Sequence, residues 1–263
     1  MRYPHVARLC YRLEPSDETS GFADPLPVER QTEAFYMRLD DNVAWFSMRE
    51  HHDTEASARE RVELYLRGWE ISAALQYGGR SEFHFVFEHA EILDLDPLPA
   101  APPGSPQTVQ LSAAAVGVGV ASVTIHVTRG SYPKPPDDFE LSEDVEVMWS
   151  LYDSYLEGRD RLLPMAYSCL SRLVYRAGSL EQAANQYRIS QRMLRTLSEL
   201  TSTLGIGMEA RKLGKGSKNR APTAEETVWI ETAVRLLIRR AGEVAYAPYK
   251  AWSMITMDNL PKL

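Results

Sequence analysis

The spacing of hydrophobic residues changes near residue 140, and this change constrains the fold more than any other feature of the chain. Before it, apolar and polar residues alternate, as at Phe83, Phe85 and Phe87, which is the spacing of half-buried strands. After it, apolar residues recur every three or four positions, as on the faces of packed helices. The pattern predicts an α+β protein: residues 1–138 form a mainly antiparallel sheet with one helix, and residues 139–263 form a helical bundle.

The N-terminal part is expected to be a sheet that carries one helix. Strands are predicted over Val6 to Leu13, Ala34 to Arg38 and Val43 to Met48. The turn composition Asp40-Asp41-Asn42 joins the last two as a β-hairpin. Between Thr54 and Gln76, four apolar residues share one helical face: Val62, Leu66, Trp69 and Ala73. The β-prone run Val109 to Thr128 predicts two more strands, and the Pro-containing segment Tyr132 to Asp138 predicts a linker.

The C-terminal part is predicted to hold four or five helices separated by short turns. Ser142 is followed by acidic residues, which is typical of a helix start. A second helix is predicted from Arg161 to Ala177, with an inward face of Leu162, Met165, Cys169, Leu170 and Leu173. The helical pattern from Leu180 to Thr203 is interrupted at Arg188-Ile189-Ser190. Thr223 begins a last helix, and the acidic residues after it are expected to fall one position short of a capping box.

The net charge of −7 is unevenly distributed along the chain. Residues 1–158 carry 12 Lys and Arg against 27 Asp and Glu, whereas residues 159–243 carry 15 against 8. A basic segment can contact phosphate groups, because that attraction depends on positive charge and not on a particular sequence. The charge distribution therefore indicates the C-terminal part as the place for an anionic partner.

The basic charges of the C-terminal part concentrate on one turn and one loop. The loop from Glu209 to Arg220 is not a Walker A loop, because Gly216 stands where that motif needs Ser or Thr. Such a loop suits contact with a phosphate backbone, although the same charges also serve solubility alone. The residues predicted to bind nucleic acid are Arg188, Gln191, Arg192, Arg195, Arg211, Lys212, Lys215, Lys218 and Arg220.

Residues 181–195 are also typical of a helix-turn-helix. Ala183 allows two helices to pack closely, and Arg188-Ile189-Ser190 suits the turn between them. Three polar residues, Gln191, Arg192 and Arg195, follow at the start of the second helix, the part that enters the major groove of DNA in such proteins. Two ordinary bundle helices that meet at a turn explain the same residues, so both interpretations stay open.

No motif of a known catalytic or metal site occurs in the sequence. The chain has neither a G-x-S-x-G nor an H-E-x-x-H sequence, and neither Cys10 nor Cys169 belongs to a C-x-x-C pair. All six histidines lie in the N-terminal part, and four are candidates for a site there: His51, His52, His84 and His89. Hydrogen-bonded surface histidines explain them at least as well, so no metal site and no cofactor are predicted.

As a whole, residues 140–245 resemble a HEPN domain, a small helical bundle of bacterial RNases and defence proteins. The resemblance rests on the order of segments: an aromatic-rich helix with Trp149, Tyr152 and Tyr155, the run Leu163 to Leu173, a helix ending at Leu197 to Leu200, an Arg-containing loop and a long last helix. A β-rich domain before such a bundle also occurs in the Apea-like branch of that family. Nucleolytic members carry Arg, a polar residue and then His a few residues on. Here Arg211 is suitably placed, but no His follows His126. The resemblance therefore implies a degenerate member that binds or dimerises without cutting RNA.

Together these features predict a non-catalytic protein that binds RNA, DNA or a protein partner, with a defence role implied by the HEPN resemblance alone. Three alternatives stay open: a helix-turn-helix transcriptional regulator, a structural subunit whose basic part docks on the acidic part of another copy, and an enzyme with a His-containing site in the N-terminal part. No apolar run reaches the ~18 residues of a membrane-spanning helix. Because Met1 to Val6 begin no apolar signal segment either, a cytoplasmic location without membrane association is expected.

Overall fold

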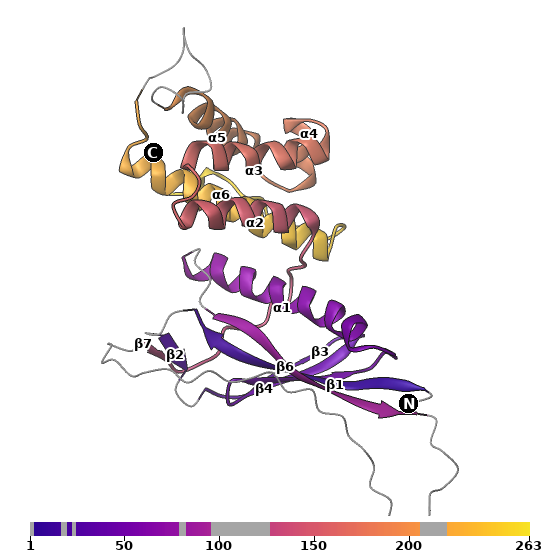
Figure 1. Ribbon diagram of the computed structural model, residues 1–263. Coiled ribbons are helices and arrows are strands. Elements are labelled where there is room, and N and C mark those ends of the chain that lie inside the picture. The colour runs from indigo at the N-terminus through magenta and orange to yellow at the C-terminus, as the bar shows by residue number, and fades with distance from the viewer. Residues whose placement is uncertain (1–2, 17–19, 23–24, 79–82, 96–126, 206–219) are drawn as a thin grey trace, which may run out of the picture. The chain divides into compact units, whose positions relative to one another are not determined.

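The chain forms two compact units, each of which has its own hydrophobic core (Figure 1). The computed structural model describes residues 3–16, 20–22, 25–78, 83–95, 127–205 and 220–263. The sheet unit comprises Met1–Ala73 and Ser81–Pro136, and the helical unit comprises Ala74–Arg80 and Asp137–Leu263. The antiparallel sheet of the first and the helices of the second confirm the predicted α+β fold. The strands predicted between Val109 and Thr128 lie almost wholly outside the described residues.

Five strands of the sheet unit pair antiparallel in the order β3-β4-β5-β1-β6. Their bounds are β1 Pro4–Pro15, β3 Val28–Gln31, β4 Phe35–Asp40, β5 Val43–Met48 and β6 Phe83–Asp94. Two short strands, β2 (Ser20–Phe22) and β7 (Val127–Arg129), form a separate parallel pair. In β4 and β5, buried residues alternate with more exposed ones, because one face of each strand lies in the core. The structure thus confirms the two strands predicted on either side of the turn Asp40-Asp41-Asn42.

The hairpin turn between β4 and β5 uses the residues that the sequence predicts. Asp41 and Asn42 have φ values of 48° and 59°, the left-handed region that a two-residue type I′ turn requires and that Asp and Asn tolerate. The Asn42 backbone N–H donates to the hydroxyl of Tyr132 at 2.7 Å. Tyr132 lies at the start of the predicted linker, yet it is buried in the core of the sheet unit.

Helix α1 (Glu55–Tyr77) covers one face of the sheet (Figure 1). The four residues predicted to share one helical face are all buried in the same hydrophobic cluster: Val62, Leu66, Trp69 and Ala73. They pack with alternate residues of the strands, among them Leu9 and Tyr11 of β1. Because side chains alternate along a strand, Cys10 between them points to the face of the sheet opposite α1.

Glu70 is a buried carboxylate that joins α1 to β6. Its Oε1 accepts a hydrogen bond from the Phe85 backbone N–H at 2.9 Å, and its Oε2 accepts one from Arg67 at 3.3 Å. Burial raises the pKa of Glu70 above its ordinary value, and the bonds from Phe85 and Arg67 offset only part of that rise. The ionised carboxylate is thus less favourable in the folded chain than in the unfolded chain.

Because the folded state holds its proton at Glu70 more tightly, the stability that this residue contributes is full at low pH and is lost as the pH rises through its raised pKa. We expect the Glu70→Gln variant, whose amide oxygen still accepts from Phe85, to gain stability relative to the wild type as the pH rises above 4.5. Denaturant unfolding of both proteins over a pH series measures this difference. A difference that stays constant or shrinks with rising pH would contradict the role given to burial.

Five α-helices and one short 3₁₀ helix make up the described part of the helical unit. Their bounds are α2 Glu143–Leu156, α3 Leu162–Ala177, α4 Leu180–Gln186, α5 Gln191–Thr203, α6 Ala224–Tyr246 and η2 Met257–Asn259. The predicted caps are confirmed at Ser142 and Thr223, whose side chains accept from the backbone N–H three residues on. The expectation for Thr223 was wrong in one respect. Glu226 lies at the third helical position and accepts from the Thr223 N–H, so the capping box is complete.

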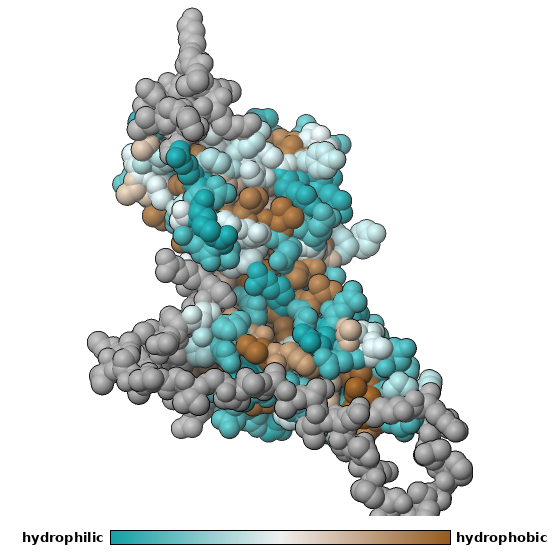
Figure 2. All heavy atoms as spheres, in the orientation of Figure 1, coloured by the Kyte–Doolittle hydropathy of each residue, from teal (hydrophilic) through white to brown (hydrophobic). Residues whose placement is uncertain are grey.

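The apolar faces of these helices meet in one core. Helix α3 contacts α2, α4, α5 and α6, and Met165, Cys169, Leu170 and Leu173 are buried as predicted. Leu162 is only half-buried, and its neighbour Leu163 takes the inward position instead. On the visible face, hydrophobic residues show in separate areas between hydrophilic ones (Figure 2). Within the described parts of the chain, no helix has the length and apolar character needed to cross a membrane.

Candidate functional site

The predicted binding group begins at the turn between α4 and α5. Four residues, Tyr187 to Ser190, separate the two helices, and Ala183 and Ala184 of α4 are buried. Arg188 has a φ of 51°, a left-handed conformation that glycine adopts more readily than arginine. Ser190 then caps α5 by accepting from the Met193 backbone N–H at 3.3 Å. The interruption predicted at Arg188-Ile189-Ser190 is thus a tight turn between two capped helices.

Helix α6 and the segment that follows it, including Ser253 and Ile255, hold this turn in place. The buried guanidinium of Arg240 donates to the carbonyl oxygens of Tyr187 at 2.9 Å, Arg188 at 3.1 Å and Ser253 at 2.8 Å. Its charge is balanced by the Glu243 carboxylate at 2.7 Å. Ile255 also exchanges backbone hydrogen bonds with the turn, donating to Arg188 O and accepting from Ser190 N. The backbone of the turn is therefore fixed from two sides.

Helix α5 buries one face and presents arginines on the other. Its apolar residues Met193, Leu194 and Leu197 are buried, whereas Arg192 and Arg195 are exposed. Arg195 donates to the Gln191 side-chain oxygen at 3.1 Å, which places that pair one turn apart on the same face. The start of α5 therefore offers two arginines and one glutamine to the surroundings.

The exposed arginines at this turn differ from others in the helical unit because no described carboxylate pairs with them. Arg188 reaches only the Trp252 carbonyl at 3.5 Å, and Arg192 has no ion-pair partner among the described residues. The ion pairs found for other arginines in the described part of the unit are Arg159–Glu157, Arg172–Glu143, Arg172–Asp144, Arg176–Asp144, Arg220–Glu226, Arg239–Asp138, Arg239–Glu243 and Arg240–Glu243. The name "arginine group" is used below for Arg188, Arg192 and Arg195.

Arg220 is engaged elsewhere. Both of its terminal nitrogens lie 2.7 Å from the two oxygens of Glu226, the residue that completes the capping box of α6. This bidentate pair gives Arg220 a part in the start of α6, so we leave it out of the arginine group. Four other predicted residues, Arg211, Lys212, Lys215 and Lys218, lie outside the described residues. The chain on either side of them is joined by a hydrogen bond from Gly205 N to Arg220 O at 2.9 Å.

Three of the histidines in the sheet unit lie together near its N-terminus. The ring of His51 stacks on Tyr3 with centroids 4.7 Å apart and on His5 with centroids 5.2 Å apart. Burial, with smaller effects of His51 and His52, lowers the pKa of His5, so its ring is neutral at neutral pH. His84 lies apart from them, 3.5 Å from Glu14. Within the described residues, neither place brings three potential metal-ligand atoms within 4.8 Å of one another.

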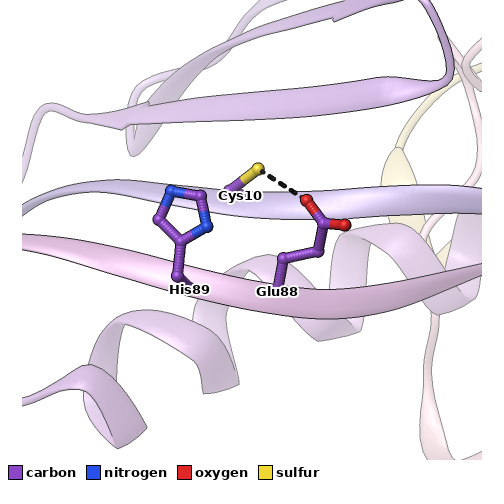
Figure 3. A group of neighbouring side chains, drawn as sticks. All are labelled: Cys10, Glu88 and His89. Carbon is purple, nitrogen blue, oxygen red and sulfur yellow. Dashed lines mark hydrogen bonds between the residues drawn. The ribbon is translucent and has the colours of Figure 1, made fainter. Parts of the chain in front are cut away.

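The pairing of β1 with β6 brings Cys10 beside Glu88 and His89 (Figure 3). The sequence did not predict this group. One potential ligand atom from each residue lies within 4.8 Å of the others. The Cys10 thiol donates to Glu88 Oε2 at 3.5 Å, and Arg12 Nε donates to Glu88 Oε1 at 2.6 Å. The edge of the Trp45 ring system meets His89, with centroids 5.3 Å apart. We call Cys10, Glu88 and His89 the "cysteine group".

Cys10 is buried, but a pocket lies next to the cysteine group. Burial, together with the hydrogen bond and negative charge of Glu88, raises the pKa of Cys10 to about 12, so the thiol is protonated at neutral pH. It is therefore a hydrogen-bond donor and a poor nucleophile. A pocket of about 540 Å³ lies over the group, and its lining is completed by Arg38, Asp40, Asp41, Val43 and Trp45.

Comparison with protein families, with curated protein sequences and with solved structures finds no match to this chain. The HEPN resemblance of residues 140–245 therefore stays a prediction.

Proposed function

We propose that the helical unit binds nucleic acid through the arginine group. The observation that carries the proposal is the position of Arg188, Arg192 and Arg195: they are exposed around one helix start and lack described carboxylate partners. An arginine paired with a carboxylate must lose that partner before it can bind a phosphate, whereas an arginine without one needs only to release solvent and counterions. The arginine group is thus the part of the described helical unit best prepared to bind an anion.

The spacing of the three arginines suits contact with a phosphate backbone. Arg192 and Arg195 lie about one turn apart on α5, and Arg188 precedes them at the turn. Guanidinium groups bind phosphate oxygens in pairs of parallel hydrogen bonds, so a row of them can follow a phosphate backbone. The exposed Glu199 lies one further turn along α5, where it limits the positive surface to the start of the helix.

Fluorescence anisotropy with labelled duplex DNA, single-stranded DNA and RNA at about 50 mM salt tests the proposal, because phosphate contacts are strongest at low salt. Saturable binding of at least one of these by the full chain is the expected result. Absence of binding to all three would overturn it. If sedimentation without nucleic acid then shows salt-sensitive self-association, the arginine group serves contact with another protein copy instead.

A second candidate is sequence-specific recognition of duplex DNA by a helix-turn-helix. The turn geometry favours it: two helices joined by four residues, buried Ala183 and Ala184 in the first helix, and a left-handed residue at the turn. In this arrangement the start of α5 enters the major groove, where Gln191 can bind adenine and Arg192 or Arg195 can bind guanine. Preference for duplex DNA over RNA in the same titrations distinguishes this mode from backbone contact alone.

The conformation of Arg188 gives a prediction that separates stability from binding. Replacing it by glycine should leave the free energy of unfolding unchanged or raise it by up to about 1 kcal/mol, because glycine adopts the left-handed region without strain but makes the unfolded chain more flexible. Affinity for nucleic acid should fall about 5–10-fold at 0.1 M salt, since one phosphate contact is lost. The matched variant Arg188→Ala should lose the same affinity without the gain in stability. A loss of more than about 1 kcal/mol in Arg188→Gly would show that the arginine side chain holds the turn.

A further inference from the structure

We propose that the cysteine group is a binding site for a divalent transition metal of the Zn²⁺ type, with Cys10, Glu88 and His89 as its protein ligands. The site belongs to the sheet unit and is independent of the nucleic-acid binding proposed for the helical unit. A sulfur, an imidazole nitrogen and a carboxylate oxygen are the three ligand types that zinc uses in proteins. The sulfur also disfavours Mg²⁺ and Ca²⁺, which prefer oxygen ligands alone.

The distances fit a tetrahedral centre after small side-chain movements. Zinc–sulfur and zinc–nitrogen bond lengths place neighbouring ligand atoms of a tetrahedron about 3.3–3.6 Å apart. The Cys10 sulfur and Glu88 Oε2 are already 3.5 Å apart. All three ligand atoms lie within 4.8 Å of one another, so any pair needs to close by about 1.5 Å at most. Rotation about side-chain bonds covers that distance without backbone movement.

A β-bulge creates the convergence. Cys10 pairs with His89 and the next residue, Tyr11, pairs with Phe87, so Glu88 is an extra residue on β6. Neighbouring residues of a regular strand point to opposite faces, but the bulge turns Glu88 to the same face as His89. Figure 3 shows both side chains on the same side of β6, beside the sulfur of Cys10. The bulge therefore supplies two adjacent ligands where a regular strand supplies one.

The neighbouring residues orient the ligands. Arg12 binds Oε1 of Glu88, which leaves Oε2 directed at Cys10 and available as a single ligand atom. Metal-ligating carboxylates are commonly held by such a hydrogen bond. The Trp45 ring system meets the His89 ring nearly at right angles, at 77° between the planes, and limits its rotation. Within the described residues, no hydrogen bond occupies a nitrogen of His89, so either nitrogen can serve.

The charges around the site decide whether a dication is accepted. The cations that face it are Arg12 and Arg38, and Arg38 is itself paired with Glu29 and Asp40. The anions are Glu88, Asp40 and Asp41, to which metal binding adds the thiolate of Cys10. When the metal binds, a metal–sulfur bond forms, the thiol proton leaves to solvent and metal-bound water is displaced. The metal and the thiolate together then add only one positive charge to the pocket.

Three protein ligands leave a fourth position of a tetrahedron for a water molecule or another small ligand. All three ligand residues line the pocket of about 540 Å³, so such a ligand can reach the metal from that pocket. Structural zinc sites have four protein ligands, whereas sites with three keep an exchangeable one. We therefore expect a metal that remains accessible to small ligands from solution.

Titration of the full chain with Zn²⁺ alone, under reducing conditions, tests the proposal by calorimetry, and Co²⁺ serves as a spectroscopic probe. The expected result is one Zn²⁺ per chain, and a thiolate-to-cobalt charge-transfer band with Co²⁺. Cys10→Ser and His89→Gln should each lower the Zn²⁺ affinity by more than about 100-fold, because loss of a ligand exceeds the usual effect of losing an outer residue. Glu88→Gln should weaken binding yet keep the charge-transfer band, since the sulfur remains.

Matched controls exist within the chain. His84→Gln changes a histidine of the same strand, and Cys169→Ala removes the other cysteine, which is buried in the helical unit. Both should leave Zn²⁺ affinity within about twofold of the wild type, because neither residue contacts the site. Circular dichroism establishes which variants fold. Failure of the wild type to bind Zn²⁺ at one equivalent, or binding that survives in the folded Cys10→Ser and His89→Gln variants, would overturn the proposal.

Discussion

Replacement of Arg240 by methionine should lower the free energy of unfolding by about 3–5 kcal/mol, the usual effect of removing one partner of a buried ion pair. Arg240 is only 3% exposed and Glu243 9% exposed, so water cannot replace the missing guanidinium freely. The variant leaves the Glu243 carboxylate with less compensation, and it leaves the carbonyl oxygens of Tyr187, Arg188 and Ser253 without this donor. Methionine fills a similar volume, so the loss reports polar contacts and not a cavity.

Chemical denaturation of the wild type and variant measures this loss. Arg239→Ala is the matched control, because Arg239 neighbours Arg240 and also pairs with Glu243 but is 35% exposed in its side chain. We expect it to cost less than about 1 kcal/mol, as partly exposed ion pairs do. Arg240→Met should also weaken nucleic-acid binding, since Arg240 holds the backbone of the turn that carries Arg188. Equal stabilities of the two variants would contradict the role given to Arg240.

Removing the whole arginine group should have the largest effect on binding. The triple variant Arg188→Ala, Arg192→Ala and Arg195→Ala should lose about 10²–10³-fold in nucleic-acid affinity at 0.1 M salt, from three lost phosphate contacts. The fold should be kept, because the three side chains are exposed and alanine favours a helix at least as well as arginine at the two helical positions, 192 and 195. Anisotropy titrations with the best-bound nucleic acid measure the affinity.

The matched control for the triple variant is Arg159→Ala, which removes an exposed arginine that is already paired with Glu157. The affinity of this variant should stay within about twofold of the wild type, because the charge of Arg159 is already balanced by Glu157. If the triple variant keeps wild-type affinity while substitutions at Arg211, Lys212, Lys215 and Lys218 abolish binding, the basic loop carries the function and the arginine group does not.

The sequence predicted those features of the fold that depend only on residues close together in the chain. The helical face of Val62, Leu66, Trp69 and Ala73 and the hairpin at Asp41 and Asn42 are local features, and the structure confirms both. The capping box at Thr223 and Glu226 is local as well. Its spacing is present in the sequence, so that error came from misplacing the first helical position and not from missing information.

The features that could not be predicted depend on pairing between strands that are distant in the sequence. The parallel pairing of β2 with β7 joins residues more than a hundred positions apart, and no local pattern encodes it. The cysteine group depends on the register of β1 against β6 and on a bulge at Glu88. Sequence inspection placed His89 among possible site residues, yet it could not place Cys10 beside it. The sequence gives no sign of the bulge, because a single residue between Phe87 and His89 is also what a regular alternating strand has.

For the residues proposed to bind nucleic acid, too, the local sequence predicts some features, and others depend on contacts between distant parts of the chain. The turn at Arg188 to Ser190 and the polar start of α5 follow from the local sequence. The local sequence does not show which arginines lack a carboxylate partner. Arg240, for example, pairs with Glu243 in α6 and is buried against the turn at Tyr187, which is distant in sequence. The structure shows that Arg188, Arg192 and Arg195 lack a described carboxylate partner, whereas Arg220 pairs with Glu226.

The salt dependence of nucleic-acid affinity in the wild type and the triple variant tests the central proposal most directly. Each phosphate contact adds about 0.9 to the slope of log affinity against log salt concentration for duplex DNA. If the arginine group binds phosphates, the slope of the triple variant should be smaller than that of the wild type by about 2.7, for three contacts. Equal slopes in the two proteins would contradict the proposal, even if their affinities differed.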